Sequence, residues 1–139
     1  MISHKQFGKL RLSQFAPEKD ITPLEDWEFM GRLCVGEAIG FSEWLRLKRT
    51  DKVLRSLALD FAELPKKVVK AVLEKLGLPL QPGMNIDQIQ TVLEKPKSTE
   101  TFTKDRKTYD FVYGKQEKYW VSCTVLNKGG LTYLVVMTR

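Results

Sequence analysis

Residues that could carry out nucleophilic or metal chemistry are few in this chain and far apart. The single histidine is His4, and the two cysteines are Cys34 and Cys123. A nucleophilic side chain needs a base held beside it, usually a histidine, and a structural zinc ion needs four ligands. Because His4 stands near a terminus that we expect to fray, neither cysteine has a base to activate it. The sequence predicts no catalytic residue, no metal ligand and no cofactor.

Carboxylates are the remaining candidates for acid–base chemistry. One cluster lies at residues 25–28, and a second pairs Asp105 with Asp110. We interpret the first as a solvated loop and Asp105-Arg106-Lys107 as a turn with a local salt bridge. The stretch from Gly36 to Gly40 matches neither a P-loop nor a dinucleotide fingerprint. We expect a protein that is not an enzyme.

The two cysteines fit no CxxC or Cys/His pattern. In a reducing compartment each is most simply a small buried hydrophobic residue with a free thiol. A disulfide between Cys34 and Cys123 is the alternative, because the sequence does not fix how far apart the two side chains lie.

Length and composition are typical of one globular domain. The chain has 139 residues, of which 42% are hydrophobic and 29% charged, so we expect a single domain over residues 1–139 with its own core. No apolar run approaches the ~20 residues of a membrane span. No signal peptide is recognised at the beginning, so we expect a cytoplasmic protein that does not bind a membrane.

The net charge of +6 suits nucleic acid, an anionic surface or an acidic protein partner. The basic residues are interspersed with other residues, however, and no block of five or six like charges forms a basic tail. We interpret them mainly as a solvated surface with excess lysine.

The C-terminal half carries the clearest structural signals. Residues 65–76 have one apolar face, begin with Pro65 at the first helical position and end before Gly77, which predicts a helix with a left-handed cap. Residues 86–94 predict a second helix, capped by Asn85. Three alternating runs between residues 107 and 137, with Gly129 and Gly130 in the last turn, predict a three-stranded antiparallel meander.

The N-terminal half is less regular. Alternation predicts a strand over residues 7–15 and another over residues 29–35, with a turn or short helix at residues 36–40. A hairpin loop is expected at residues 49–52. Residues 53–61 fit a strand and a helix equally well by spacing, and we favour the strand because of the turn before them.

These elements predict an α+β fold. A helix pair packs on an antiparallel meander over residues 65–139, and a β-rich N-terminal part over residues 1–64 extends it. The apolar faces of the two helices should form the core, with buried residues Val69, Leu73, Leu76, Ile89 and Leu93.

The sequence also resembles a known module. Gly83-Met84, Gln88-Ile89, Leu93 and Pro96, followed by strands with Tyr109 and Phe111, are similar to the repeat of the small outer-membrane-assembly lipoproteins (the SmpA/OmlA or BamE type) and of β-lactamase-inhibitor-like domains. This resemblance covers residues 65–139 and implies a helix pair on a three-stranded sheet that grips another protein. Glu94 stands where those families usually have glycine, and no lipidated cysteine stands near the N-terminus.

The aromatic residues suggest where a partner would bind. Trp120 is out of phase with the apolar row of Tyr119, Val121 and Cys123 in its strand, and exposed tryptophan is typical of interface hot spots. We expect a partner-binding surface at Trp120, with Arg106, Lys118 and Tyr119. The predicted function is a protein-binding module of the immunity or inhibitor type that blocks a toxin or an enzyme.

The alternative is a nucleic-acid-binding domain that uses a basic, aromatic sheet surface. Lys107, Tyr109, Lys118 and Trp120 would then lie together, so that the rings stack on bases and the lysines contact phosphates.

Overall fold

The computed structural model describes residues 1–11, 23–24, 36–39, 45–50 and 53–138. Its helices are α1 (His4–Gly8), α2 (Lys66–Leu76) and α3 (Ile86–Leu93). Its strands are β1 (Pro23–Leu24), β2 (Gly36–Ile39), β3 (Leu45–Thr50), β4 (Val53–Asp60), β5 (Ser98–Thr103), β6 (Arg106–Tyr113), β7 (Tyr119–Leu126) and β8 (Gly130–Met137). No helix among these described residues is long and apolar enough to cross a membrane.

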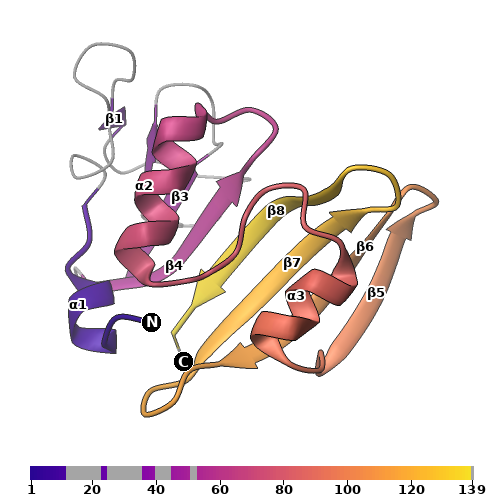
Figure 1. Ribbon diagram of the computed structural model, residues 1–139. Coiled ribbons are helices and arrows are strands. Elements are labelled where there is room, and N and C mark those ends of the chain that lie inside the picture. Colours follow the sequence, from indigo (N-terminus) through magenta and orange to yellow (C-terminus); the bar gives the residue numbers. More distant parts are fainter. Residues whose placement is uncertain (12–22, 25–35, 40–44, 51–52, 139) are drawn as a thin grey trace.

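The described strands form one antiparallel sheet in the order β1-β2-β3-β4-β8-β7-β6-β5 (Figure 1). Strands β5 to β8 follow one another as a meander, and β4 pairs with the free side of β8. Gly129 and Gly130, with φ of 125° and 74°, make the last turn. The predicted meander is confirmed, and β5 extends it to four strands.

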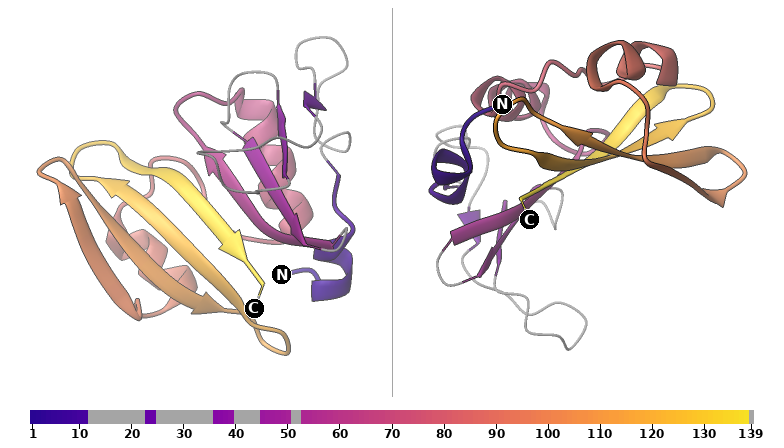
Figure 2. Two further views of the ribbon diagram at one scale, coloured as in Figure 1. Left: turned by 180° about the vertical axis from the view of Figure 1, so that it is seen from behind. Right: turned by 90° about the horizontal axis from the view of Figure 1, so that it is seen from below.

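Helices α2 and α3 lie on the same side of the sheet, as Figure 2 shows from below. Their apolar faces meet the inward residues of β4, β6, β7 and β8 in one buried cluster. All five residues predicted to be in the core are at most 6% exposed: Val69, Leu73, Leu76, Ile89 and Leu93. The predicted α+β arrangement, with a helix pair on an antiparallel sheet, is confirmed.

The helix ends follow from their capping residues. Asn85 accepts a hydrogen bond from the Gln88 backbone, and the Gln88 side chain accepts one from the Asn85 backbone, which is a capping box. Gly77 ends α2 with φ of 69° and ψ of 34°, as predicted. Pro65 is the N-cap of α2, one position before the helical place predicted for it.

The N-terminal half departs from the predictions at two places. Residues 4–8 form helix α1 where a strand was predicted from residue 7, because Ser3 and Gln6 make a capping box that starts a helix. Residues 36–39 form strand β2, paired with β3, where a turn or short helix was predicted. The rest of the first predicted strand, beyond residue 11, and the predicted strand at residues 29–35 lie outside the described residues.

Two other N-terminal predictions are confirmed. Residues 53–60 are strand β4, which settles the ambiguity in their spacing in favour of the strand. Strand β3 pairs with β4 in antiparallel register from Leu45↔Leu59 to Thr50↔Val53, as expected for two arms of a hairpin. Strand β3 continues through two residues, 49 and 50, that were predicted to belong to the loop.

Candidate protein-binding surfaces

The two faces of β7 differ sharply in burial. Tyr119, Val121, Cys123 and Val125 point into the core beneath the helices and are at most 7% exposed. The alternate residues, from Trp120 to Leu126, are half-buried on the opposite face. We call this opposite side the back face; Figure 2 shows it from behind, with α2 on the far side of β3 and β4 and α3 on the far side of the β5–β8 meander.

Apolar residues from four strands meet on the back face. Trp120 pairs with Val112 on β6 and with Met137 on β8. In the next row, Val135 pairs with Ala58 on β4. All five side chains are half-buried, and we call Val112, Trp120, Met137, Val135 and Ala58 the back-face patch. Since paired residues on one face have Cβ atoms about 5 Å apart, the patch is continuous across the sheet.

Polar residues continue the back face beyond this patch. Asp110 pairs with Ser122, and Thr108 pairs with Thr124. The two threonine hydroxyls are 3.0 Å apart and hydrogen-bonded. An apolar centre with a polar border is the usual composition of a protein interface.

Tyr119 does not belong to the predicted binding surface, although its neighbour Trp120 lies in the back-face patch. It is 1% exposed. Its hydroxyl donates a hydrogen bond to the Ile2 carbonyl oxygen at 2.6 Å, and its ring packs edge-to-face on Phe7 at a centroid distance of 5.4 Å. Burial raises the pKa of Tyr119 to about 12. The reason for the misplacement is the two-residue period of a strand, which sends adjacent side chains to opposite faces.

Arg106 lies far from Trp120 rather than near it. Arg106 pairs with Leu126, whereas Trp120 pairs with Val112, six residues further along β6. At about 3.3 Å per residue, these two positions are roughly 20 Å apart. Lys118 is exposed just before β7, two residues from Trp120. Its ammonium group donates to the Gly114 carbonyl oxygen. Of the three residues predicted to lie around Trp120, only Lys118 is both exposed and close to the back-face patch.

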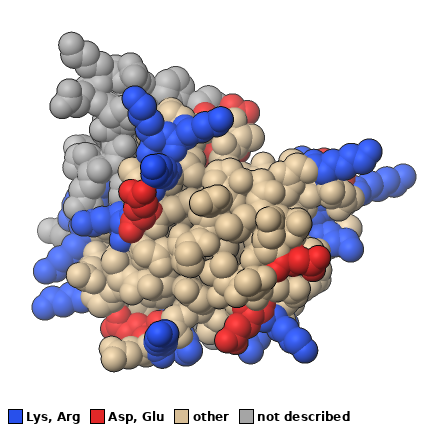
Figure 3. Space-filling model, in the orientation of Figure 1, with Lys and Arg blue, Asp and Glu red and all other residues tan. Residues whose placement is uncertain are grey.

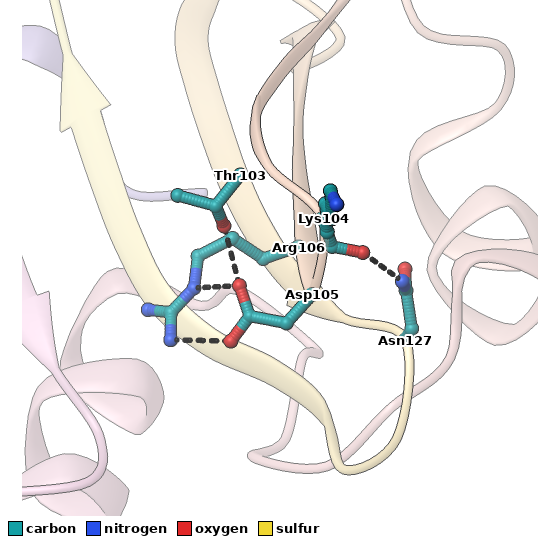
Figure 4. A network of polar contacts seen from close by, with 5 residues as sticks. All are labelled: Thr103, Lys104, Asp105, Arg106 and Asn127. Carbon is teal, nitrogen blue, oxygen red and sulfur yellow. Dashed lines mark hydrogen bonds and ion pairs between the residues drawn. The ribbon is translucent and has the colours of Figure 1, made fainter.

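Arg106 instead takes part in a network at the far turns of the sheet (Figure 4). Its guanidinium group contacts the Asp105 carboxylate through Nε at 3.2 Å and Nη2 at 3.0 Å. The hydrogen bond from Arg106 and a second from the Thr103 hydroxyl lower the pKa of Asp105 to about 2. The predicted local salt bridge at this turn is confirmed.

The same network joins two hairpin turns. The Asn127 side-chain amide donates to the Lys104 carbonyl oxygen at 2.8 Å, and the Asn127 backbone N–H donates to the Asp105 carbonyl oxygen at 2.8 Å. The β5–β6 turn is thereby held against the β7–β8 turn (Figure 4). The Asp105 carboxylate, by contrast, accepts hydrogen bonds from Thr103 and Arg106, within its own turn.

His4 is held in place, contrary to the expectation of a frayed terminus. Its Nε2 donates to the Lys118 carbonyl oxygen at 2.8 Å, its backbone N–H donates to the Glu117 carboxylate, and its ring stands edge-to-face on Tyr119 at 4.7 Å. The Ile2 N–H also donates to the Leu76 carbonyl oxygen at 3.0 Å. The cause is the capped helix α1, which fixes the segment that carries His4.

Cys123 is fully buried in the core with a free thiol. Burial, and to a smaller extent the charge of Asp110, raises its pKa to about 12. A thiol with that pKa is almost entirely protonated at neutral pH and is a poor nucleophile. Cys34 lies outside the described residues. Among the residues that are described, no group of three or more His, Cys, Asp and Glu side chains could hold a metal ion.

The surface proposed for nucleic acid is not formed as predicted. Tyr109 pairs with Cys123, and Lys107 pairs with Val125, so both positions lie on the helix-covered side. Trp120 lies on the back face, so its ring and that of Tyr109 cannot stack on one strand of bases. In Figure 3 the Lys and Arg side chains stand around the rim of the visible face, with uncharged surface at its centre.

Two hollows lie on the helix-covered side, and sequence reasoning identified neither. A hollow of about 810 Å³ lies between residues 1–3, the end of α3 and the loop at residues 114–118. A groove of about 950 Å³ runs along α2. The first hollow depends on segments far apart in sequence. The groove is lined mainly by residues 61–82, and it forms only where the connector after α2 folds back beside the helix.

Comparison with family models, with curated proteins and with solved structures gives no match to this chain. The resemblance to the outer-membrane-assembly lipoproteins and β-lactamase-inhibitor-like domains stays a prediction.

Proposed function

We propose that this chain is a non-enzymatic protein-binding module and that its partner covers the back-face patch. The observation that carries this proposal is Trp120, half-buried between Val112 and Met137 on a sheet face that no described helix covers. Tryptophan is enriched among interface residues that dominate binding energy. Methionine is also enriched at interfaces relative to the rest of a protein surface.

The surroundings of the patch also favour a protein partner. Its apolar residues lie on four adjacent strands, which are about 4.8 Å apart, so the centre of the contact would be about 15 Å wide. Ser122, Thr124 and Asp110 supply a border able to form hydrogen bonds. A nucleic-acid partner would need phosphate-binding cations around its stacking rings, and the lysine and aromatic positions of this sheet are divided between its faces.

The partner class that we propose is a toxin or an enzyme that the module blocks in the cytoplasm, in the manner of an immunity protein or inhibitor. The support is the small size of the chain and the lack of a catalytic motif in its sequence. The product of a neighbouring gene is the first partner to test, because an immunity protein is expected beside its toxin.

The experiment compares two variants on the same face for stability and for affinity to that co-expressed gene product. Trp120→Ala should weaken binding by about 2 kcal/mol or more, which is roughly 30-fold in Kd, while the fold stays intact. Thr124→Ala, in the polar border on the same strand and face, is the matched control. Because border contacts around a hot spot contribute little binding energy, it should change Kd by less than about threefold.

Other results would contradict the proposal. A lower melting temperature for Trp120→Ala with unchanged affinity would show that the chain's own N-terminal half covers the tryptophan. Salt-dependent binding of an oligonucleotide, with loss of affinity as counterion release predicts, would favour the nucleic-acid alternative.

A further inference from the structure

The groove along α2 is built from two walls. Its lining includes Lys66 and Gly77, near the two ends of α2, and residues 78–82 of the connector to α3, with Phe61 and Tyr113 completing it. The eleven residues of α2, at 1.5 Å each, give a length of about 16 Å. Phe61 and Tyr113 pack against the core from the helix-covered side, so the groove lies on the side opposite the back-face patch.

The lining is mainly apolar. The apolar surface that an occupant can reach comes from Phe61 and Tyr113, which are half-buried, and from the exposed Pro79 and Pro82. Beneath them lies a floor of aliphatic core residues that are at most 6% exposed: Val69, Leu73, Leu78 and Leu80. The two prolines also have no N–H to donate to an occupant. An occupant would therefore have to present an apolar face.

The connector wall is fixed in place before any occupant arrives. The Leu78 N–H donates to the Leu73 carbonyl oxygen at 3.1 Å, and the Gly83 N–H donates to the Leu131 carbonyl oxygen at 3.0 Å. A Cβ on Gly130 would lie 2.1 Å from the Gly83 carbonyl oxygen, so glycine is what lets the connector approach β8 this closely. A preformed wall lowers the entropy cost of binding.

The charged side chains of the groove have an excess of positive charge. Lys66 and Lys70 stand one turn apart on α2, and Glu74 is the one carboxylate in the described lining. Lys70 Nζ and a Glu74 oxygen are 4.0 Å apart, with 78% and 69% of the two side chains exposed. Because both side chains are so exposed, this ion pair contributes little to stability. Lys70 can therefore leave Glu74 and pair with a carboxylate of an occupant. The cationic rim favours an occupant with acidic residues beside its apolar face.

We propose that this groove binds an amphipathic, acidic α-helix of about three turns from a partner protein. The apolar face of that helix packs between α2 and the connector, and its acidic flank meets Lys66 and Lys70. An extended peptide fits less well, because it needs backbone partners and two of the wall residues are prolines. This site goes beyond the proposed function, since it lies on the other side of the sheet.

The test uses the full chain and two synthetic peptides of about 14 residues, or four turns. Both carry leucine at helical spacing along one face; one has glutamate at the flanking positions and the other has lysine. Binding is followed by NMR with labelled protein. The acidic peptide should bind more tightly, and the amide shifts should concentrate in α2 and residues 77–82.

Charge reversal then separates specific from general attraction. The double variant Lys66→Glu, Lys70→Glu should raise the Kd of the acidic peptide at least tenfold and lower the Kd of the lysine peptide. The control, Lys95→Glu with Lys97→Glu, makes the same change in net charge at exposed positions outside the groove, and should change Kd less than twofold. Trp120→Ala should leave this affinity unchanged, which keeps the result independent of the back face.

Several outcomes would overturn the proposal. The first is that neither peptide binds at millimolar concentration, and the second is that both bind with equal affinity. The third is that the Lys95→Glu, Lys97→Glu control loses as much affinity as the groove variant. The fourth is that the amide shifts are centred on the back face. Concentration-dependent shifts in the groove without peptide would show that a second copy of the chain occupies it instead.

Discussion

The Tyr119 hydroxyl donates a hydrogen bond of 2.6 Å to the carbonyl oxygen of Ile2, which lies 117 residues earlier in the chain. This contact joins the first residues to the start of β7, at the place where His4 also reaches the Lys118 carbonyl oxygen. The N-terminal segment is thus part of the folded unit that supports β7, and β7 carries Trp120.

Tyr119→Phe tests this connection. Removing the hydroxyl leaves the Ile2 carbonyl oxygen without that donor, so the free energy of unfolding should fall by about 1–2 kcal/mol. Urea denaturation measures the change. Partner affinity should stay unchanged, because the side chain is in the core; a binding defect without loss of stability would contradict its placement there.

Leu73→Ala tests whether α2 contributes to the main core. Leu73 is 6% exposed and belongs to the buried cluster, so its truncation should cost about 2–5 kcal/mol. The same denaturation experiment applies, with Lys70→Ala on the exposed face of α2 as control. A loss for Leu73→Ala below about 1 kcal/mol would show that this face is not core.

The turn network predicts a pH dependence of stability. The folded state holds the pKa of Asp105 at about 2, below its usual value of 3.8, because Arg106 and Thr103 donate to the carboxylate. A lowered pKa means that the unfolded chain binds the proton first, so this stabilisation is present above pH 4 and is lost as pH falls toward 2. Melting temperatures between pH 5 and 2 should fall less steeply for Asp105→Asn than for the natural chain.

The control for this experiment is Glu100→Gln, which changes an exposed carboxylate on the neighbouring strand β5. Its pH dependence should follow that of the natural chain. If Asp105→Asn gave the same pH dependence as the natural chain, the network would not hold the charged form of Asp105 in solution.

Elements whose signal is local were predictable from the sequence. The apolar stripe of α2, the cap at Asn85 and the glycines at residues 129–130 each specify structure within a few residues. Strand β5 gave no such signal, because Ser98, Thr99 and Glu100 are polar and exposed at the edge of the sheet. Helix α1 is only five residues long, too short for its periodicity to outweigh the alternation that follows it.

The candidate site was predictable only at Trp120, whose place opposite the apolar row follows from the period of its own strand. Arg106 was misplaced because its distance from Trp120 depends on the register between β6 and β7, which no local pattern gives. The groove along α2 was missed for a similar reason, since its walls meet only after the connector has docked on β8.

Glu94 offers a test at the end of α3. Its φ of 67° and ψ of −149° lie close to a backbone region that glycine alone adopts easily. Glu94→Gly should relieve strain of about 1–3 kcal/mol, partly offset by the greater entropy of glycine in the unfolded chain, about 0.4–1 kcal/mol. The expected net gain is about 1 kcal/mol in the free energy of unfolding. Glu94→Ala is the control, because it removes the same side chain but keeps a Cβ, and it should give no gain. If both variants had equal stability, the side chain and not the backbone would determine the energy of this position.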